Sequence, residues 1–80
     1  MKIAVNVHLK QGVLDPQGKA VHHALENLGF KNVADVRVGK QIIVEVEIDN
    51  EEEALREVGE MADKLLANPV IENYTLEVIK

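Results

Sequence analysis

The chain has 80 residues, a net charge of −5 and no cysteine, and its only aromatic residues are one phenylalanine and one tyrosine. A chain of this length is expected to form one domain over residues 1–80 and to bury only about 60–65% of its unfolded surface. Its acidic charge argues against nucleic acid binding, and without cysteine neither a disulfide nor a thiolate metal site reinforces the core. We therefore expect association with other chains, as a dimer or tetramer, to supply stability.

No apolar run approaches the roughly 20 residues of a membrane helix, and no signal-peptide core opens the sequence. We expect a cytoplasmic protein that binds neither membranes nor nucleic acids.

The first elements are a strand and a helix. Apolar residues alternate from Ile3 to Leu9, which predicts a strand with one buried face. Asp15 is typical of a helix N-cap, and Pro16 suits the first helical position, where no N–H is needed. An apolar stripe then follows at helical spacing until Gly29, which is expected to end the helix.

Two further strands are expected at residues 34–38 and 42–48, where apolar and charged residues alternate. A two-residue turn between them would put their apolar sets on opposite faces of the sheet. A three-residue connection, Gly39-Lys40-Gln41, instead places Val36 opposite Val44 and Ala34 opposite Val46. We therefore predict a hairpin with this longer turn.

The last elements are a second helix and a final strand. Asn50 is the predicted N-cap, with Glu53 three residues later as in a capping box. The apolar stripe of this helix extends to Leu66, with Gly59 at its edge, where close packing against a strand is the expected reason for glycine. Alternation from Tyr74 to Val78 predicts the last strand.

The element order βαββαβ predicts an α+β, ferredoxin-like fold: an antiparallel sheet with two helices on one face, oligomerising through the sheet. The other face is then bare, and its mixed apolar and charged side chains suit a protein partner better than a small molecule. Unpaired edge strands favour the same conclusion.

The residues do not form a catalytic set. Cysteine and serine are absent, and the one threonine, Thr75, has no histidine or lysine beside it in the sequence. His22 and His23 are adjacent, whereas a chelating pair on a helix needs a spacing of three or four, so we expect no metal site. The glycines at 12 and 18 are one residue too far apart for a phosphate loop. Amides at this helix start could still receive an anion beside Lys19.

Three stretches carry a resemblance to a known family: residues 13–21 (VLDPQGKAV), 35–40 (DVRVGK) and 64–74 (KLLANPVIENY). In their residues, in their order and in the spacing between them, these stretches resemble PurS, the family of small subunits of phosphoribosylformylglycinamidine (FGAM) synthase. The resemblance leaves little of the chain uncovered, although none of the stretches is a catalytic signature.

The resemblance implies a non-catalytic subunit of an ATP-dependent amidotransferase in purine biosynthesis. Such a subunit joins a glutaminase subunit, which releases ammonia, to a large synthase subunit, and it assists assembly and ammonia transfer. The complex uses ATP and magnesium, and this chain is expected to bind neither.

The resemblance also places contacts to other subunits at the positions that match the first two stretches. These positions are Asp15, Pro16, Gln17, Gly18, Lys19, Arg37, Gly39 and Lys40.

Two alternatives use the same topology. One is an ACT-like regulatory domain that binds a small metabolite at a dimer interface. The other is an acylphosphatase-like enzyme, which would need an arginine in the loop after the first strand, and residues 10–14 contain none.

Overall fold

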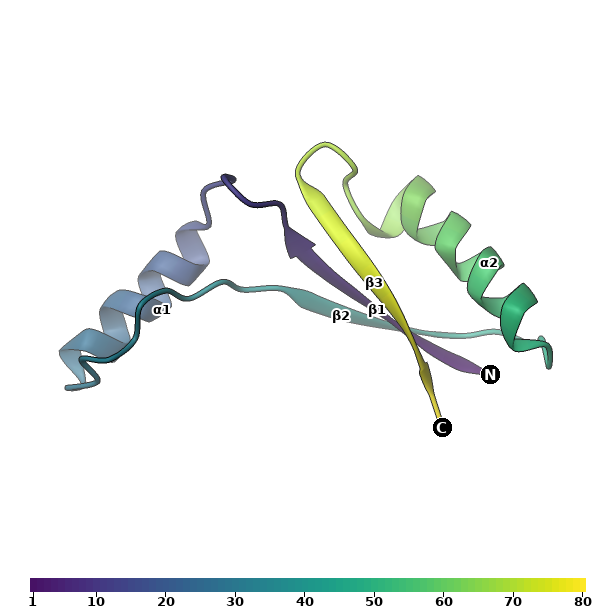
Figure 1. The fold of residues 1–80 in the computed structure, drawn as a ribbon, viewed down its shortest axis with the longest axis horizontal. Helices are drawn as coiled ribbons and strands as arrows, with labels where there is room; N and C mark the ends of the chain where they lie inside the picture. Colours follow the sequence, from purple (N-terminus) through teal and green to yellow (C-terminus); the bar gives the residue numbers. More distant parts are fainter.

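Strand β1 (Lys2–Leu9) lies at the centre of a three-stranded antiparallel sheet in the computed structural model of the chain, which describes residues 1–80 (Figure 1). Strand β2 (Lys40–Glu45) pairs along one side of β1, and β3 (Glu72–Ile79) pairs along the other. The strand order is therefore β2-β1-β3, and β2 and β3 each leave one edge unpaired.

The core lies on one face of this sheet. On that face Ile3 is flanked by Val44 on β2 and by Val78 on β3. Helix α2 (Glu51–Met61) covers the face and buries Val58 completely. Only 11 of the 80 residues are buried, so this one helix and three strands enclose a core even thinner than the length predicts.

Helix α2 begins as its sequence predicts. The Asn50 side chain accepts a hydrogen bond from the Glu53 amide at 2.9 Å, which confirms the predicted N-cap. Gly59 faces β3, but a Cβ added there would stand 3.7 Å from Leu76 Cδ1, an ordinary contact, so the prediction that close packing explains glycine at this position is wrong. The helix continues into a π-helical turn, η1 (Ala62–Leu66), which ends before the loop to β3.

Helix α1 (Pro16–Asn27) also has the predicted ends, because Asp15 caps its start and Gly29 follows it with a φ of +97°. It stands away from the sheet and from α2 (Figure 1). Gly18 is its only buried residue, so the apolar stripe expected along this helix is present but uncovered.

Residues 31–39, which include the expected second strand at 34–38, run extended from the end of α1 into β2 without pairing with a strand of this chain (Figure 1). The hairpin predicted at Gly39-Lys40-Gln41 is therefore wrong for the single chain, because Lys40 and Gln41 already belong to β2. Gly39 has no left-handed φ, and its lack of a side chain instead allows its backbone to approach the carbonyl of Val7.

The result is an elongated molecule measuring 48 × 28 × 14 Å, with a radius of gyration of 15.9 Å. A compact domain of this length has a radius of gyration of about 12 Å. We use the term arm for residues 10–39, which comprise α1 and the two connections that join it to the sheet. Neither helix combines the length and the apolar character that crossing a membrane requires.

Candidate functional site

The side chain of Asp15 joins the two connections at the base of the arm. Its Oδ1 accepts a hydrogen bond from the Gly18 amide, and its Oδ2 accepts one from the Val38 amide, both at 2.8 Å. Asp15 is the only buried charged residue of the chain. The Gly18 amide, followed by the Val38 amide, lowers the pKa of the carboxyl group, because both bonds favour its charged form. Asp15 is therefore a carboxylate that holds α1 against residue 38.

Two glycines allow the close approaches that this geometry needs. A Cβ added to Gly18 would overlap the carbonyl oxygen of Val36, and one added to Gly39 would lie 2.7 Å from the carbonyl oxygen of Val7. Neither space accepts a side chain, since real Cβ atoms do not approach backbone oxygens so closely. Gly18 thus allows the start of α1 to pack against Val36, and Gly39 allows the chain that returns from α1 to pack against β1.

Arg37 ties the same two connections from the outside. Its Nη1 donates to the Val13 carbonyl at 2.8 Å, and its Nη2 donates to the Lys10 carbonyl at 3.2 Å. We refer to Asp15, Gly18, Arg37 and Val38 together as the clasp. The two sequence stretches that contain them are far apart in the chain and meet here.

The remaining predicted interface residues are all exposed. The side chains of Gln17 and Lys40 line a hollow of about 180 Å³ that also reaches Asp15 and Gly39. Pro16 and Lys19 are exposed beside it. The structure therefore places all eight predicted residues around one end of the arm. Asp15, Gly18, Arg37 and Gly39 contact their own chain, and the other four offer their side chains to solvent.

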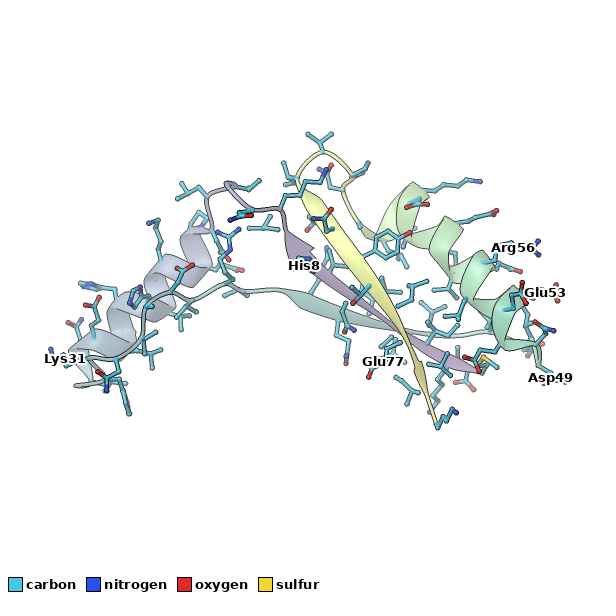
Figure 2. The ribbon with its side chains drawn as sticks, in the orientation of Figure 1. His8, Lys31, Asp49, Glu53, Arg56 and Glu77 are labelled. Carbon is cyan, nitrogen blue, oxygen red and sulfur yellow. The ribbon has the colours of Figure 1, made fainter.

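A second hollow, of about 490 Å³, lies on the outer side of Arg37. His8 and Asn73 border it from two strands, and Asp35 borders it from the arm. His8 lies at the end of β1 that faces the arm (Figure 2). This hollow is polar and open, and it holds acidic, basic and neutral groups.

Sequence reasoning did not predict that the arm would present apolar side chains to solvent. Val21, Leu28 and Phe30 are 43%, 73% and 57% exposed, and Leu14 and Val38 add to them near the base. Lys31 marks the end of the arm farthest from α2 (Figure 2). The helical spacing of the stripe was visible in the sequence, but its lack of a cover inside the chain was not.

A tyrosine contact was also missed. The hydroxyl of Tyr74 donates to Oδ1 of Asp63 at 2.8 Å, with the Gly59 carbonyl as a second acceptor at 3.2 Å. The hydrogen bond to Asp63 raises the pKa of Tyr74, because a nearby carboxylate disfavours the phenolate. Lys10 and Tyr74 line a hollow of about 290 Å³ beside this contact.

The histidines do not gather. His22 Nε2 lies 2.9 Å from the Val33 carbonyl and joins α1 to the returning chain, while His8 belongs to β1. No three histidine, aspartate or glutamate side chains are grouped as a metal site would require.

A protein-family model described as PurS, phosphoribosylformylglycinamidine (FGAM) synthase, matches residues 2–80. The chain is 48% identical to subunit PurS of that synthase from Methanocaldococcus jannaschii, over 99% of this chain and 95% of the relative. It is 50% identical to the Bacillus subtilis subunit PurS, over 96% of this chain and 90% of the relative.

Solved structures agree with these relatives. The crystal structure of Methanocaldococcus jannaschii PurS superimposes with a TM-score of 0.88, covering 99% of this chain and 95% of that one. A PurS chain from a structure of PurLQS from Thermotoga maritima gives 0.88 at 35% identity, covering 98% and 95%. These likenesses confirm the predicted α+β, ferredoxin-like fold class.

Proposed function

Because the chain belongs to the PurS family, we propose that it is the small, non-catalytic subunit of FGAM synthase and bridges the glutaminase and the ATP-dependent synthase subunits. The observation that carries the proposal is the match over residues 2–80, together with the likeness to a subunit solved within an assembled PurLQS complex. The ACT-like alternative receives no support from these relatives.

A bridging role fits the chemistry of the chain. It has no cysteine or serine, and its one threonine lies on β3, so it offers no evident nucleophile for releasing ammonia from glutamine. ATP and magnesium are proposed to bind the large subunit. The proposal also places the chain in the cytoplasm, where a complex that consumes ATP and glutamine is expected.

The physical need for such a subunit lies in the nature of ammonia. Ammonia released into water is protonated and lost as a nucleophile, so the site that produces it and the site that consumes it must stay docked and shielded. A small subunit that holds two larger ones in register can meet this need without contributing a reacting group.

The surface of the chain supports partners of two kinds. The arm exposes apolar side chains such as Leu28 and Phe30, which suit contact with a second copy of this chain. Gln17, Lys19 and Lys40 provide exposed polar groups at its base, which suit the larger subunits. We propose that the chain self-associates through the first surface and contacts the larger subunits through the second.

Reconstitution tests the bridging role. Amidine formation by the large subunit and the glutaminase is measured with and without this chain, using either glutamine or ammonia as the nitrogen source. Only the glutamine-dependent rate is expected to need the chain. An unchanged glutamine-dependent rate, with no complex on sizing, would exclude the role for these partners.

Charge reversal then locates the contact. Lys19→Glu and Lys40→Glu are expected to weaken the glutamine-dependent rate. Lys64→Glu is the matched control, because Lys64 is also exposed but lies in η1, away from the clasp. Equal effects of all three variants would argue for a general charge effect and against a local contact.

A further inference from the structure

The loop that connects η1 to β3 presents an apolar side chain to solvent at its tip. Val70 is 78% exposed, and among the large apolar residues only Leu65 is more exposed. Pro69, which precedes Val70, is exposed as well. We use the term tip loop for residues 67–71. Single exposed apolar residues are common on protein surfaces, so the setting of Val70 decides whether it marks a contact.

The tip loop is held in one shape by hydrogen bonds to Asn68. The Asn68 side chain accepts a bond from the Val70 amide at 3.0 Å, and its carbonyl accepts bonds from the Ile71 and Glu72 amides at 3.2 and 2.7 Å. The Asn68 amide in turn donates to Oε1 of Glu72 at 2.7 Å. A side chain on a preorganised loop loses little conformational entropy when a partner binds it.

Lys10 fixes the tip loop to the base of the arm. Its amide donates to the Ile71 carbonyl at 2.8 Å, and its Nζ donates to the Pro69 carbonyl at 2.7 Å. The carbonyl of Lys10 accepts a bond from Arg37 of the clasp. The tip loop and the connection from β1 to α1 lie at the same end of the sheet (Figure 1). The tip loop and the clasp are therefore parts of one hydrogen-bonded unit.

The tip loop also continues into the surface that we propose for the larger subunits. Glu72, which directly follows the loop, borders the hollow of about 180 Å³ together with Gln17 and Lys40. Leu65 lies before the loop, in η1, and borders none of the hollows at this end of the molecule. The link to the base of the arm therefore distinguishes Val70 from Leu65, although both are exposed.

The charges beside the tip loop indicate what kind of partner fits it. Lys19 and Lys40 are exposed at the base of the arm. The neighbouring carboxylates of Asp15 and Glu72 are hydrogen-bonded to amides of their own chain. The free charge at this end is therefore positive, and a complementary partner surface carries carboxylates.

We propose that the tip loop docks into one of the two larger subunits, with Val70 as the apolar anchor and the lysines at the base of the arm as its charged border. The proposal rests on the bridging role proposed above and specifies its contact. The matching site on the larger subunit is an apolar recess with carboxylates at its rim. Contacts between proteins commonly have such an apolar centre and polar rim, and residues at the centre carry most of the binding energy.

A titration of the reconstituted complex tests the anchor. The measured quantity is the concentration of this chain that gives half of the maximal glutamine-dependent rate. Val70→Asp is expected to raise this concentration at least about tenfold, because an unpaired charge is costly to bury in an apolar recess. Leu65→Asp is the matched control, since Leu65 is 83% exposed and lies outside the tip loop, and it is expected to change the value less than about twofold. Both variants should keep the wild-type midpoint of urea unfolding, because both side chains lie mostly in solvent.

The outcomes separate this proposal from the bridging role. Equal effects of the two substitutions, or no effect of Val70→Asp, would overturn the docking of the tip loop and leave the bridging role standing. If wild-type protein does not raise the glutamine-dependent rate, the bridging role fails and this proposal fails with it. A loss of self-association in Val70→Asp on sizing would also overturn the proposal, because the loop would then contact a second copy of the chain.

A single cysteine identifies the subunit that the tip loop enters, because the chain has no cysteine of its own. Val70→Cys and the control Leu65→Cys are each labelled with an environment-sensitive dye such as acrylodan and then mixed with the glutaminase, the synthase subunit or both. Emission from position 70 is expected to shift to shorter wavelength with one of the two subunits, whereas emission from position 65 stays unchanged. A dye at position 70 that remains in water, within a complex that sizing shows to have formed, would contradict the docking of the loop.

Discussion

Asp15 and Val38 are joined by a hydrogen bond of 2.8 Å from the Val38 amide to Oδ2 of the carboxylate, across 23 residues of chain. The other oxygen of the same carboxylate caps α1 through the Gly18 amide. One side chain therefore fixes both the start of the helix and the path of the chain that returns from it. The direction of the arm therefore depends on both hydrogen bonds of the Asp15 carboxylate.

Replacing Asp15 by asparagine is expected to destabilise the protein in a pH-dependent manner. The pKa of Asp15 is lowered in the folded state, so its contribution is fully present above the unfolded pKa of about 3.9 and is lost as the pH falls through the folded pKa. Urea unfolding of wild type and Asp15→Asn should differ at pH 7 and converge in strong acid. A gap of constant size down to pH 2 would contradict the role of the carboxylate charge.

Gly18→Ala is expected to destabilise the chain by about 1–3 kcal/mol, the usual cost of overpacking. The added methyl group would overlap the Val36 carbonyl oxygen, so α1 or the returning chain must shift. Chemical denaturation gives the magnitude, and amide exchange at Val38 is expected to accelerate. Unchanged exchange at this amide would show that the clasp survives the substitution.

Gly59→Ala is expected to have the opposite sign. The nearest atom to its added Cβ is Leu76 Cδ1 at 3.7 Å, an ordinary contact, and alanine is favoured over glycine inside a helix by about 1 kcal/mol. The midpoint of urea unfolding should rise without a change in slope. The same denaturation assay is therefore expected to show a loss of stability for Gly18→Ala in α1 and a gain for Gly59→Ala in α2.

Tyr74 is expected to ionise above its usual pKa of about 10, because its hydroxyl donates to Asp63. It is the only tyrosine, and the chain has no tryptophan, so absorbance at about 295 nm reports this group alone. Because the pKa of Tyr74 is raised, the stability that its hydrogen bond contributes is present below the unfolded pKa and is lost as the pH rises through the folded pKa. Asp63→Asn should lower the midpoint of the absorbance titration. An unchanged titration midpoint would exclude the carboxylate as the cause.

The local features of this chain were predictable, and one long-range feature was not. Asp15, Gly29 and Asn50 set helix ends through contacts within a few residues, so their sequence context was sufficient. Gly39 has the same identity whether it forms a turn or allows another backbone to approach. The approach of Val7, which decides between the two, lies in a distant part of the chain.

Whether the eight selected residues contact other subunits stays a prediction, and their arrangement in the fold could be predicted only in part. The resemblance selected residues at both connections of the arm, and the structure brings them together. It did not distinguish those that bind their own backbone, such as Arg37, from those with free side chains, such as Lys19. That distinction depends on which carbonyls lie within reach, a property of the folded path.

The clasp also determines how mutation can act at the base of the arm. Asp15 and Arg37 bind amides and carbonyls of residues 10, 13, 18 and 38, which every substitution except proline leaves chemically intact. The residues that provide these backbone groups can therefore drift in sequence, apart from Gly18, while Asp15 and Arg37 stay fixed. A saturation library of the arm should reveal this as a few intolerant positions among permissive neighbours, so a fixed residue here need not mark a surface that another subunit touches.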